Sequence, residues 1–138
     1  MSVGFEVDCF YYTIGTADFL NSFFSTVFVK LECSRWGSRF PILMNDLYQG
    51  VLPKESVYKA QEELATIKKE LELLPPSEIV WDFDDLSLTP PWGDNISPEI
   101  RTMADYFVTS EGENLLSVLD EALRKAVTLN EAVTIVNI

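Results

Sequence analysis

The chain opens with an alternation of apolar and polar residues that is typical of a half-buried strand. Between residues 5 and 9, apolar side chains alternate with Glu6 and Asp8, and successive side chains of a strand face opposite sides of a sheet. The aromatic residues at positions 10–12 either continue this strand or pair back on it as a hairpin. The pattern therefore predicts that the N-terminal segment belongs to a sheet.

Apolar residues then recur at spacings of three and four over residues 17–32, which is the period of a helix. Thr16 is suited to cap its first turn, and Asp18 is favourably placed near the positive end of the helix dipole. Several phenylalanines, including Phe28, widen the apolar stripe until little of the helix is polar. Such a helix is expected to pack deeply against a sheet.

Two further helices are predicted after a polar, glycine-containing connection over residues 33–40. They cover residues 41–48 and 53–74, and each begins at a proline, which favours the first turn of a helix. Two consecutive prolines end the second helix. Its single apolar stripe consists of Val57, Ala60, Leu64, Ile67, Leu71 and Leu74.

The middle of the chain is the least regular part. Residues 79–83 alternate and predict a strand, whereas residues 84–98 contain three prolines, a glycine and an Asp-Asn pair, which disfavour regular structure. A short helix over 99–103 and a strand over 105–109 are expected to follow. Long ordered loops in small domains are often functional, so this region is a candidate binding site.

The C-terminal part predicts one more helix and a strand. Ser110 and Glu113 have the spacing of a capping box, and the helix is expected to end near residue 127. Its inward-facing residues are Leu115, Leu116, Leu119, Leu123 and Ala126. A run rich in β-branched residues over 132–138 closes the chain as a strand.

The predicted order of elements is β, α, α, α, β, β, α, β. This order favours an α+β fold with a single mixed or antiparallel sheet packed by three or four helices. No internal repeat or linker interrupts the 138 residues, so residues 1–138 are expected to form a single domain.

The composition fits an ordered domain, since 47% of the residues are hydrophobic. The sequence has neither an apolar run long enough for a transmembrane helix nor the features of a signal peptide, so a cytoplasmic location is expected. In that setting Cys9 and Cys33 are expected to be buried, unreactive thiols.

The chain has no histidine, the commonest general base and metal ligand. Its six glycines are scattered and do not form a phosphate-binding loop. The carboxylates near Asp82 are suited to magnesium, calcium or glycosidase chemistry, but their spacing is not that of a calcium loop. We therefore predict no catalytic residues, no metal site and no cofactor.

The charge is strongly negative and unevenly distributed. A net charge of −12 argues against nucleic acid and anionic membranes as partners. Residues 78–113 contain nine acidic residues and one basic residue, which gives a local charge of −8. Four aromatic residues, Trp81, Phe83, Trp92 and Tyr106, are interleaved with these acids. We call residues 78–113 the acidic segment.

Acids around aromatic anchors suit the recognition of a basic protein. The predicted partner-binding residues are Asp82, Asp84, Asp85, Trp92, Asp94, Asn95, Glu99 and Asp105. Simpler interpretations stay open: the acids form a solvated face, and Trp81 and Trp92 belong to the core. Trp36, with Arg35 and Arg39 nearby, is interpreted as part of a loop tied to the acidic face by ion pairs.

Several phrases of the sequence resemble the immunity protein 70 family, whose members are small cytoplasmic bacterial proteins associated with polymorphic toxin systems. The likeness spans nearly the whole chain. It is carried by residues 2–5, 14–20, 37–41, 44–50 and 106–109, and most specifically by Pro-Pro-Trp-Gly-Asp-Asn-Ile-Ser at 90–97. The resemblance implies a protein that binds and blocks a cognate toxin domain encoded nearby. It supplies no catalytic or contact residues.

The sequence thus favours an immunity protein that neutralises a toxin domain by stoichiometric, electrostatically assisted binding. The expected partner is basic, for example a nuclease. Two alternatives remain at this point: a metal-binding carboxylate enzyme, and an adaptor that self-associates through the helix over 54–74. The oligomeric state is left open.

Overall fold

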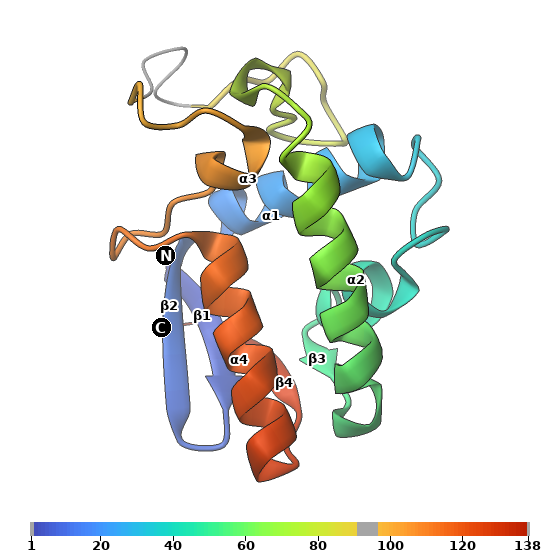
Figure 1. Ribbon diagram of the computed structural model, residues 1–138, viewed down its shortest axis with the longest axis vertical. Coiled ribbons are helices and arrows are strands. Elements are labelled where there is room, and N and C mark those ends of the chain that lie inside the picture. The colour runs from blue at the N-terminus through green and yellow to red at the C-terminus, as the bar shows by residue number, and fades with distance from the viewer. Residues whose placement is uncertain (1, 91–96, 138) are drawn as a thin grey trace.

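The N-terminal hairpin and the C-terminal strand lie side by side in one sheet (Figure 1). The computed structural model describes residues 2–90 and 97–137. The strands in this part of the chain are β1 (Ser2–Val7), β2 (Phe10–Thr16), β3 (Val51–Leu52) and β4 (Val133–Asn137). They pair antiparallel in the order β2-β1-β4-β3. The predicted α+β fold is confirmed. Of the two predicted kinds of sheet, mixed and antiparallel, the structure has the antiparallel one.

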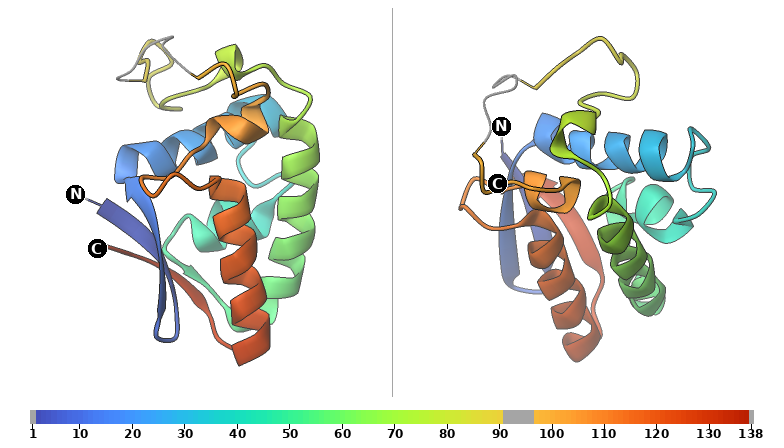
Figure 2. Two further views of the ribbon diagram at one scale, coloured as in Figure 1. Left: turned by 60° about the vertical axis from the view of Figure 1, so that its left-hand side comes forward. Right: turned by 45° about the horizontal axis from the view of Figure 1, so that its top comes forward.

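Helices cover one side of this sheet and one end of it. They are α1 (Ala17–Thr26), α2 (Val57–Leu71), α3 (Met103–Tyr106) and α4 (Leu115–Leu129), with the π-helical segments η1 (Val27–Leu31) and η2 (Ile42–Leu47) and the 3-10 turns η3 (Lys54–Ser56) and η4 (Pro76–Glu78). Figure 2 shows the sheet, α4 and α2 as successive layers, with α1 across one end. No helix within the described residues is both long and apolar enough to span a bilayer.

The three longest predicted helices are present, and their apolar stripes form the core. The hydroxyl oxygen of Thr16 accepts a hydrogen bond from Phe19 N (3.2 Å), so this residue caps α1 as expected. The helix continues without a break into η1, which matches the prediction over 17–32. The α2 stripe from Val57 to Leu71 is buried, and so are the five inward-facing residues predicted for α4. Burial of these apolar stripes is the main source of stability of such a fold.

The alternating N-terminal segment forms a hairpin of β1 and β2. The turn of this hairpin bears on the prediction that the two cysteines are buried. Val3, Phe5 and Val7 are buried, whereas the turn at Asp8 and Cys9 is exposed. Cys33 is exposed as well and has a left-handed backbone (φ 52°). The expectation of buried thiols is therefore wrong, because both cysteines lie in turns just beyond the ends of the apolar elements.

The predicted strand over 105–109 is absent: α3 ends at Tyr106, and beyond it Val108 makes an isolated β-bridge to Asn114. Met103 and Tyr106 are buried on α3, and Phe107 is buried directly after the helix ends. Phe107 packs its ring on Phe23 and Phe19, at centroid distances of 5.6 and 6.0 Å. The expected helix over 99–103 is also wrong, since a turn and an extended approach to α3 occupy that stretch.

The predicted capping box is wrong as well. The N-cap of α4 is Asn114, whose side-chain oxygen accepts a hydrogen bond from Ser117 N (3.2 Å). Ser110 instead donates its backbone N–H to the carbonyl of Ile14 at the edge of the sheet (3.0 Å). Residues 110–112 form a turn, in which Gly112 N donates to the carbonyl of Thr109 (2.9 Å), and the helix begins only at Leu115.

Candidate partner-binding surface

The stretch over 79–83, predicted to be a strand, is held by side chains of α1 rather than by a neighbouring strand. The carbonyl of Val80 accepts hydrogen bonds from the hydroxyls of Ser22 (3.0 Å) and Thr26 (3.2 Å). Val80 N donates to Thr26 Oγ1 (3.1 Å), and Phe83 N donates to Ser25 Oγ (3.1 Å). These three hydroxyls are buried on α1. They fix the backbone of this stretch on the helix surface, which is why no ladder forms and the strand prediction is wrong.

Phe83 is thereby placed against three other aromatic rings. The aromatic cluster, as we call it, consists of Phe28, Trp36, Tyr48 and Phe83. The ring centroids of Trp36 lie 4.7 Å from Tyr48, 5.0 Å from Phe83 and 5.1 Å from Phe28. The rings come from η1, the loop over 33–40, the end of η2 and the stretch over 79–85. None of them is fully buried, and Tyr48 is 38% exposed.

The loop that carries Trp36 is shaped by one buried carboxylate. Glu32 accepts hydrogen bonds from the backbone N–H groups of Gly37 (3.0 Å), Arg39 (3.1 Å) and Phe40 (3.0 Å). Three such donors compensate the cost of burying a charge. Trp36 Nε1 donates in turn to the carbonyl of Met44 (2.7 Å), which fixes the indole on η2.

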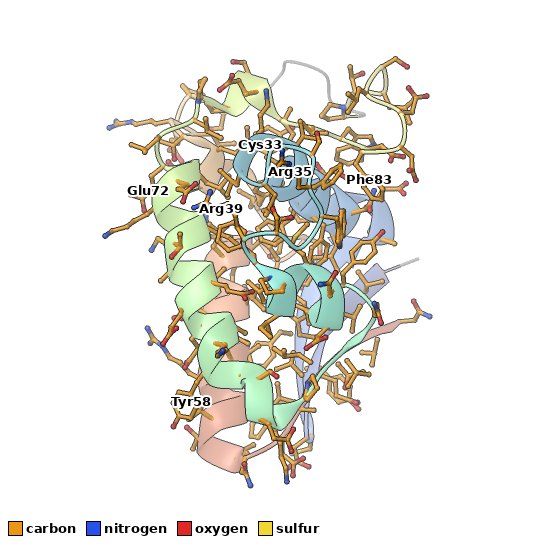
Figure 3. The ribbon with its side chains drawn as sticks, turned by 90° about the vertical axis from the view of Figure 1, so that its right-hand side faces the viewer. Cys33, Arg35, Arg39, Tyr58, Glu72 and Phe83 are labelled. Carbon is orange, nitrogen blue, oxygen red and sulfur yellow. The ribbon has the colours of Figure 1, made fainter. Side chains whose placement is uncertain are left out.

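Arg39 ties the same loop to α2 (Figure 3). Its guanidinium makes a two-pronged ion pair with the Glu70 carboxylate, with 2.6 Å between Nη1 and Oε1, and donates to the carbonyl of Leu31 (2.9 Å). The hydrogen bond from Arg39 lowers the pKa of Glu70. The loop is thus held by an ion pair, but its partner lies on α2 and outside the acidic segment, so this part of the sequence interpretation is wrong.

Acidic side chains border the aromatic cluster on one side. Asp82 and Asp84 flank Phe83 in the sequence, and the pKa of Tyr48 is raised by burial and then by the negative charges of Asp84 and Asp82. Asp82 Oδ1 accepts a hydrogen bond from Asp84 N (2.9 Å), and Asp85 Oδ1 accepts one from Ser87 N (3.0 Å). We call Asp82, Asp84 and Asp85 the acidic rim.

The aromatic cluster and the acidic rim suit noncovalent recognition. Aromatic rings supply contact area with few rotatable bonds, and aspartates beside them favour a cationic partner. The model of the family described as Immunity protein 70 matches residues 5–135 of the chain. The chain belongs to this family. It is therefore an immunity protein, as the resemblance implied, and the match includes every residue of the cluster and the rim. No curated protein and no solved structure matches the chain.

The predicted site residues of this immunity protein fall into three groups. Asp82, Asp84 and Asp85 come together on the acidic rim. Glu99 lies exposed in a turn, and Asp105 lies exposed on α3 beside a groove that is also lined by Lys68 and Glu72. The predicted residues Trp92, Asp94 and Asn95 lie outside the described residues.

Sequence reasoning missed most of the aromatic side of this surface. Trp36 was noted only as part of a loop, and Tyr48 was not singled out. Phe28 did leave a signal, because it falls outside the narrow apolar stripe of its helix. Trp81, interpreted as a possible core residue, is half-buried and packs against the core.

Among the residues that the structure describes, the carboxylates of the immunity protein do not gather in the way that a metal site requires. Within residues 2–90 and 97–137, no group of three or more acidic or cysteine side chains is arranged to hold a metal ion. Asp82 and Asp85 instead accept hydrogen bonds from the backbone of their own turns. In this part of the chain the rim aspartates act as turn formers that also present charge.

Proposed function

We propose that this immunity protein neutralises its cognate toxin domain by stoichiometric binding through the aromatic cluster and the acidic rim. The observation that carries the proposal is their juxtaposition on one surface: four partly exposed rings packed together, with carboxylates close enough to raise the pKa of Tyr48. Half-exposed aromatic groups with a polar rim are the usual composition of interface hot spots.

The contacts behind this surface favour tight binding. Trp36 is fixed by its bond to Met44 and by the Glu32 carboxylate, and the backbone of Phe83 is fixed by Ser25. A surface that is already ordered loses little conformational freedom when a partner binds. We therefore infer that the rings meet the toxin in nearly their present arrangement.

The charge of the protein supports a basic toxin domain, such as a nuclease. The net charge is −12, and the acidic segment contributes −8 of it. Opposite charges on the two partners accelerate association and select the orientation in which the acidic rim faces a basic patch. For neutralisation in the cytoplasm, the complex must then dissociate more slowly than the free toxin acts on its target.

Co-expression tests this function. The C-terminal domain of the product of the neighbouring upstream gene is expressed in bacteria alone, with this protein, or with an unrelated acidic protein of similar size. The proposal predicts that growth is restored only by this protein and that a one-to-one complex co-purifies. Toxicity that persists in the presence of the folded protein would contradict the proposal.

A further inference from the structure

An apolar groove lies between α1 and the sheet, next to the aromatic cluster. It has a volume of about 350 Å³. Its main lining residues are Val3, Ala17, Leu20, Phe24, Tyr48 and Ile135. No lining residue carries a charge, so the groove suits an apolar group rather than an ion.

The groove and the aromatic cluster form one continuous apolar surface, because Tyr48 belongs to both. Its ring packs edge-on against Phe24 on the groove side, with 5.1 Å between centroids, and against Trp36 on the cluster side, with 4.7 Å. Since Tyr48 is 38% exposed, a partner that reaches the cluster also reaches the mouth of the groove.

The charged side chains on the elements around the groove are all acidic. Its walls belong to β1, α1 and β4, with Tyr48 following directly after η2. In these four elements, all within the described residues, the charged side chains are Glu6, Asp18 and Asp46, and there is no lysine or arginine. Asp82 and Asp84, which flank Phe83 of the aromatic cluster, add negative charge that acts on Tyr48. The complementary partner is therefore apolar at its centre and basic around it.

We propose that this groove holds a large apolar side chain of the cognate toxin, presented by a segment that carries lysine or arginine on either side. This inference rests on the proposed function and names the anchor through which the toxin is held. The volume of the groove is near the lower end of the range of about 300–1,000 Å³ that is usual for binding pockets. This size suits one anchor side chain rather than a large ligand. An anchor in a pocket surrounded by a polar rim is the arrangement that dominates binding energy in many interfaces.

Filling the groove tests the inference. Ala17 is exposed and lines the groove, and Ala65 is an exposed helical alanine that lines the separate groove between α2 and α4. The Kd for the toxin domain encoded by the upstream gene is measured with wild type, Ala17→Trp and Ala65→Trp. We expect Ala17→Trp to raise the Kd by about tenfold or more, the effect of losing one hot-spot contact, and Ala65→Trp to leave it within about twofold.

A second matched pair guards against misfolding of the first. Asn21 lines the groove and Gln61 lines the one between α2 and α4, and both are half-buried amides on helices. Asn21→Arg places a cation where a basic segment should dock, so it is expected to weaken binding much more than Gln61→Arg. Thermal unfolding identifies which variants are folded, and only those enter the comparison.

The outcomes separate this inference from the proposed function. If wild type binds the toxin and folded Ala17→Trp and Asn21→Arg bind equally well, the anchor is elsewhere and the inference is overturned while the proposed function stands. If wild type itself fails to bind, the proposed function fails first. If Ala17→Trp instead abolishes a dimer seen by sedimentation of the free wild-type protein, the groove holds a second copy, which also overturns the inference.

Discussion

Glu32 is the residue on which the shape of the Trp36 loop depends most. It is 2% exposed, and its carboxylate accepts three backbone N–H groups, of which the one on Phe40 is buried and the other two are partly buried. A hydrogen bond to a charged group contributes about 1.5–3 kcal/mol, and an unsatisfied buried donor costs about 1–3 kcal/mol. One side chain thus controls the position of Trp36 in the aromatic cluster.

Replacing this carboxylate should be costly. We expect Glu32→Ala to lower the free energy of unfolding by about 3 kcal/mol, because several backbone donors lose their acceptor together. Glu62→Ala, an exposed glutamate on α2, is the control and should change it by less than about 0.5 kcal/mol. Urea denaturation measures both. Equal stabilities of the two variants would show that the loop does not depend on Glu32.

Glu70 makes the stability depend on pH. Its pKa is lowered from the ordinary 4.5, first by the hydrogen bond from Arg39. The unfolded chain therefore takes up the proton at a higher pH than the folded protein does. The stabilisation is fully present above about pH 4.5 and is lost as the pH falls through the lower folded pKa.

Glu70→Gln should consequently be less stable than wild type at neutral pH, and the difference should shrink below pH 4.5. The midpoint of urea unfolding, followed from neutral to acidic pH for both proteins, tests this. Because both partners of the pair are partly exposed, salt is expected to reduce the difference at neutral pH. A difference that stays constant with pH would contradict the assigned ion pair.

At the scale of the element, hydroxyl groups of α1 make the backbone hydrogen bonds of Val80 that a neighbouring strand would otherwise make. Thr26 is fully buried, and its hydroxyl bonds both the N–H and the carbonyl of Val80. We expect Thr26→Val, which keeps the shape and removes the hydroxyl, to destabilise the protein by about 1–3 kcal/mol. Hydrogen exchange of the Val80 amide should also accelerate.

The control for this change is Thr66→Val on α2, where an exposed threonine bonds only the carbonyl of Glu62. It should leave the exchange of the Val80 amide unchanged. If Thr26→Val also leaves that amide protected, the Thr26 hydroxyl is not what holds the stretch over 79–83 on α1.

The elements show which parts of the fold local sequence determines. The stripes of α2 and α4 and the alternation in β1 are long enough that only one burial pattern fits them. The apolar runs over 79–83 and 105–109 are short, and tertiary partners decide their structure: hydroxyls of α1 bond Val80, and Phe107 packs on Phe23. Short apolar runs do not distinguish strand from helix or coil without such partners.

At the scale of the whole molecule, charge was predictable and the aromatic surface was not. The acidic segment is continuous in sequence, so the charge near Asp82, Asp84 and Asp85 can be read directly from the sequence, whereas their role in binding stays a prediction. The aromatic cluster draws its rings from four separate segments, with Tyr48 and Phe83 35 positions apart in sequence. Such a surface exists only once the fold has brought the segments together.

The proposed binding of the toxin depends on the position of the acidic rim and not only on the net charge. Asp82→Asn, Asp84→Asn and Asp85→Asn together remove three negative charges, while asparagine keeps the side-chain oxygen that accepts the turn hydrogen bonds of Asp82 and Asp85. Glu55→Gln, Glu62→Gln and Glu131→Gln together remove three charges from exposed positions elsewhere. Both triple variants have a net charge of −9, which is −12 plus 3.

The decisive measurement is the association rate of the toxin domain with wild type and with these two triple variants, at low and at high salt. The rim variant is expected to associate about tenfold more slowly than wild type at low salt, because its basic partner is attracted less strongly. The control variant is expected to associate less than about threefold more slowly. The difference between the two variants should disappear at high salt, which screens the charges. Equal slowing of the two variants, or no slowing of the rim variant, would contradict the assignment of this surface to toxin binding.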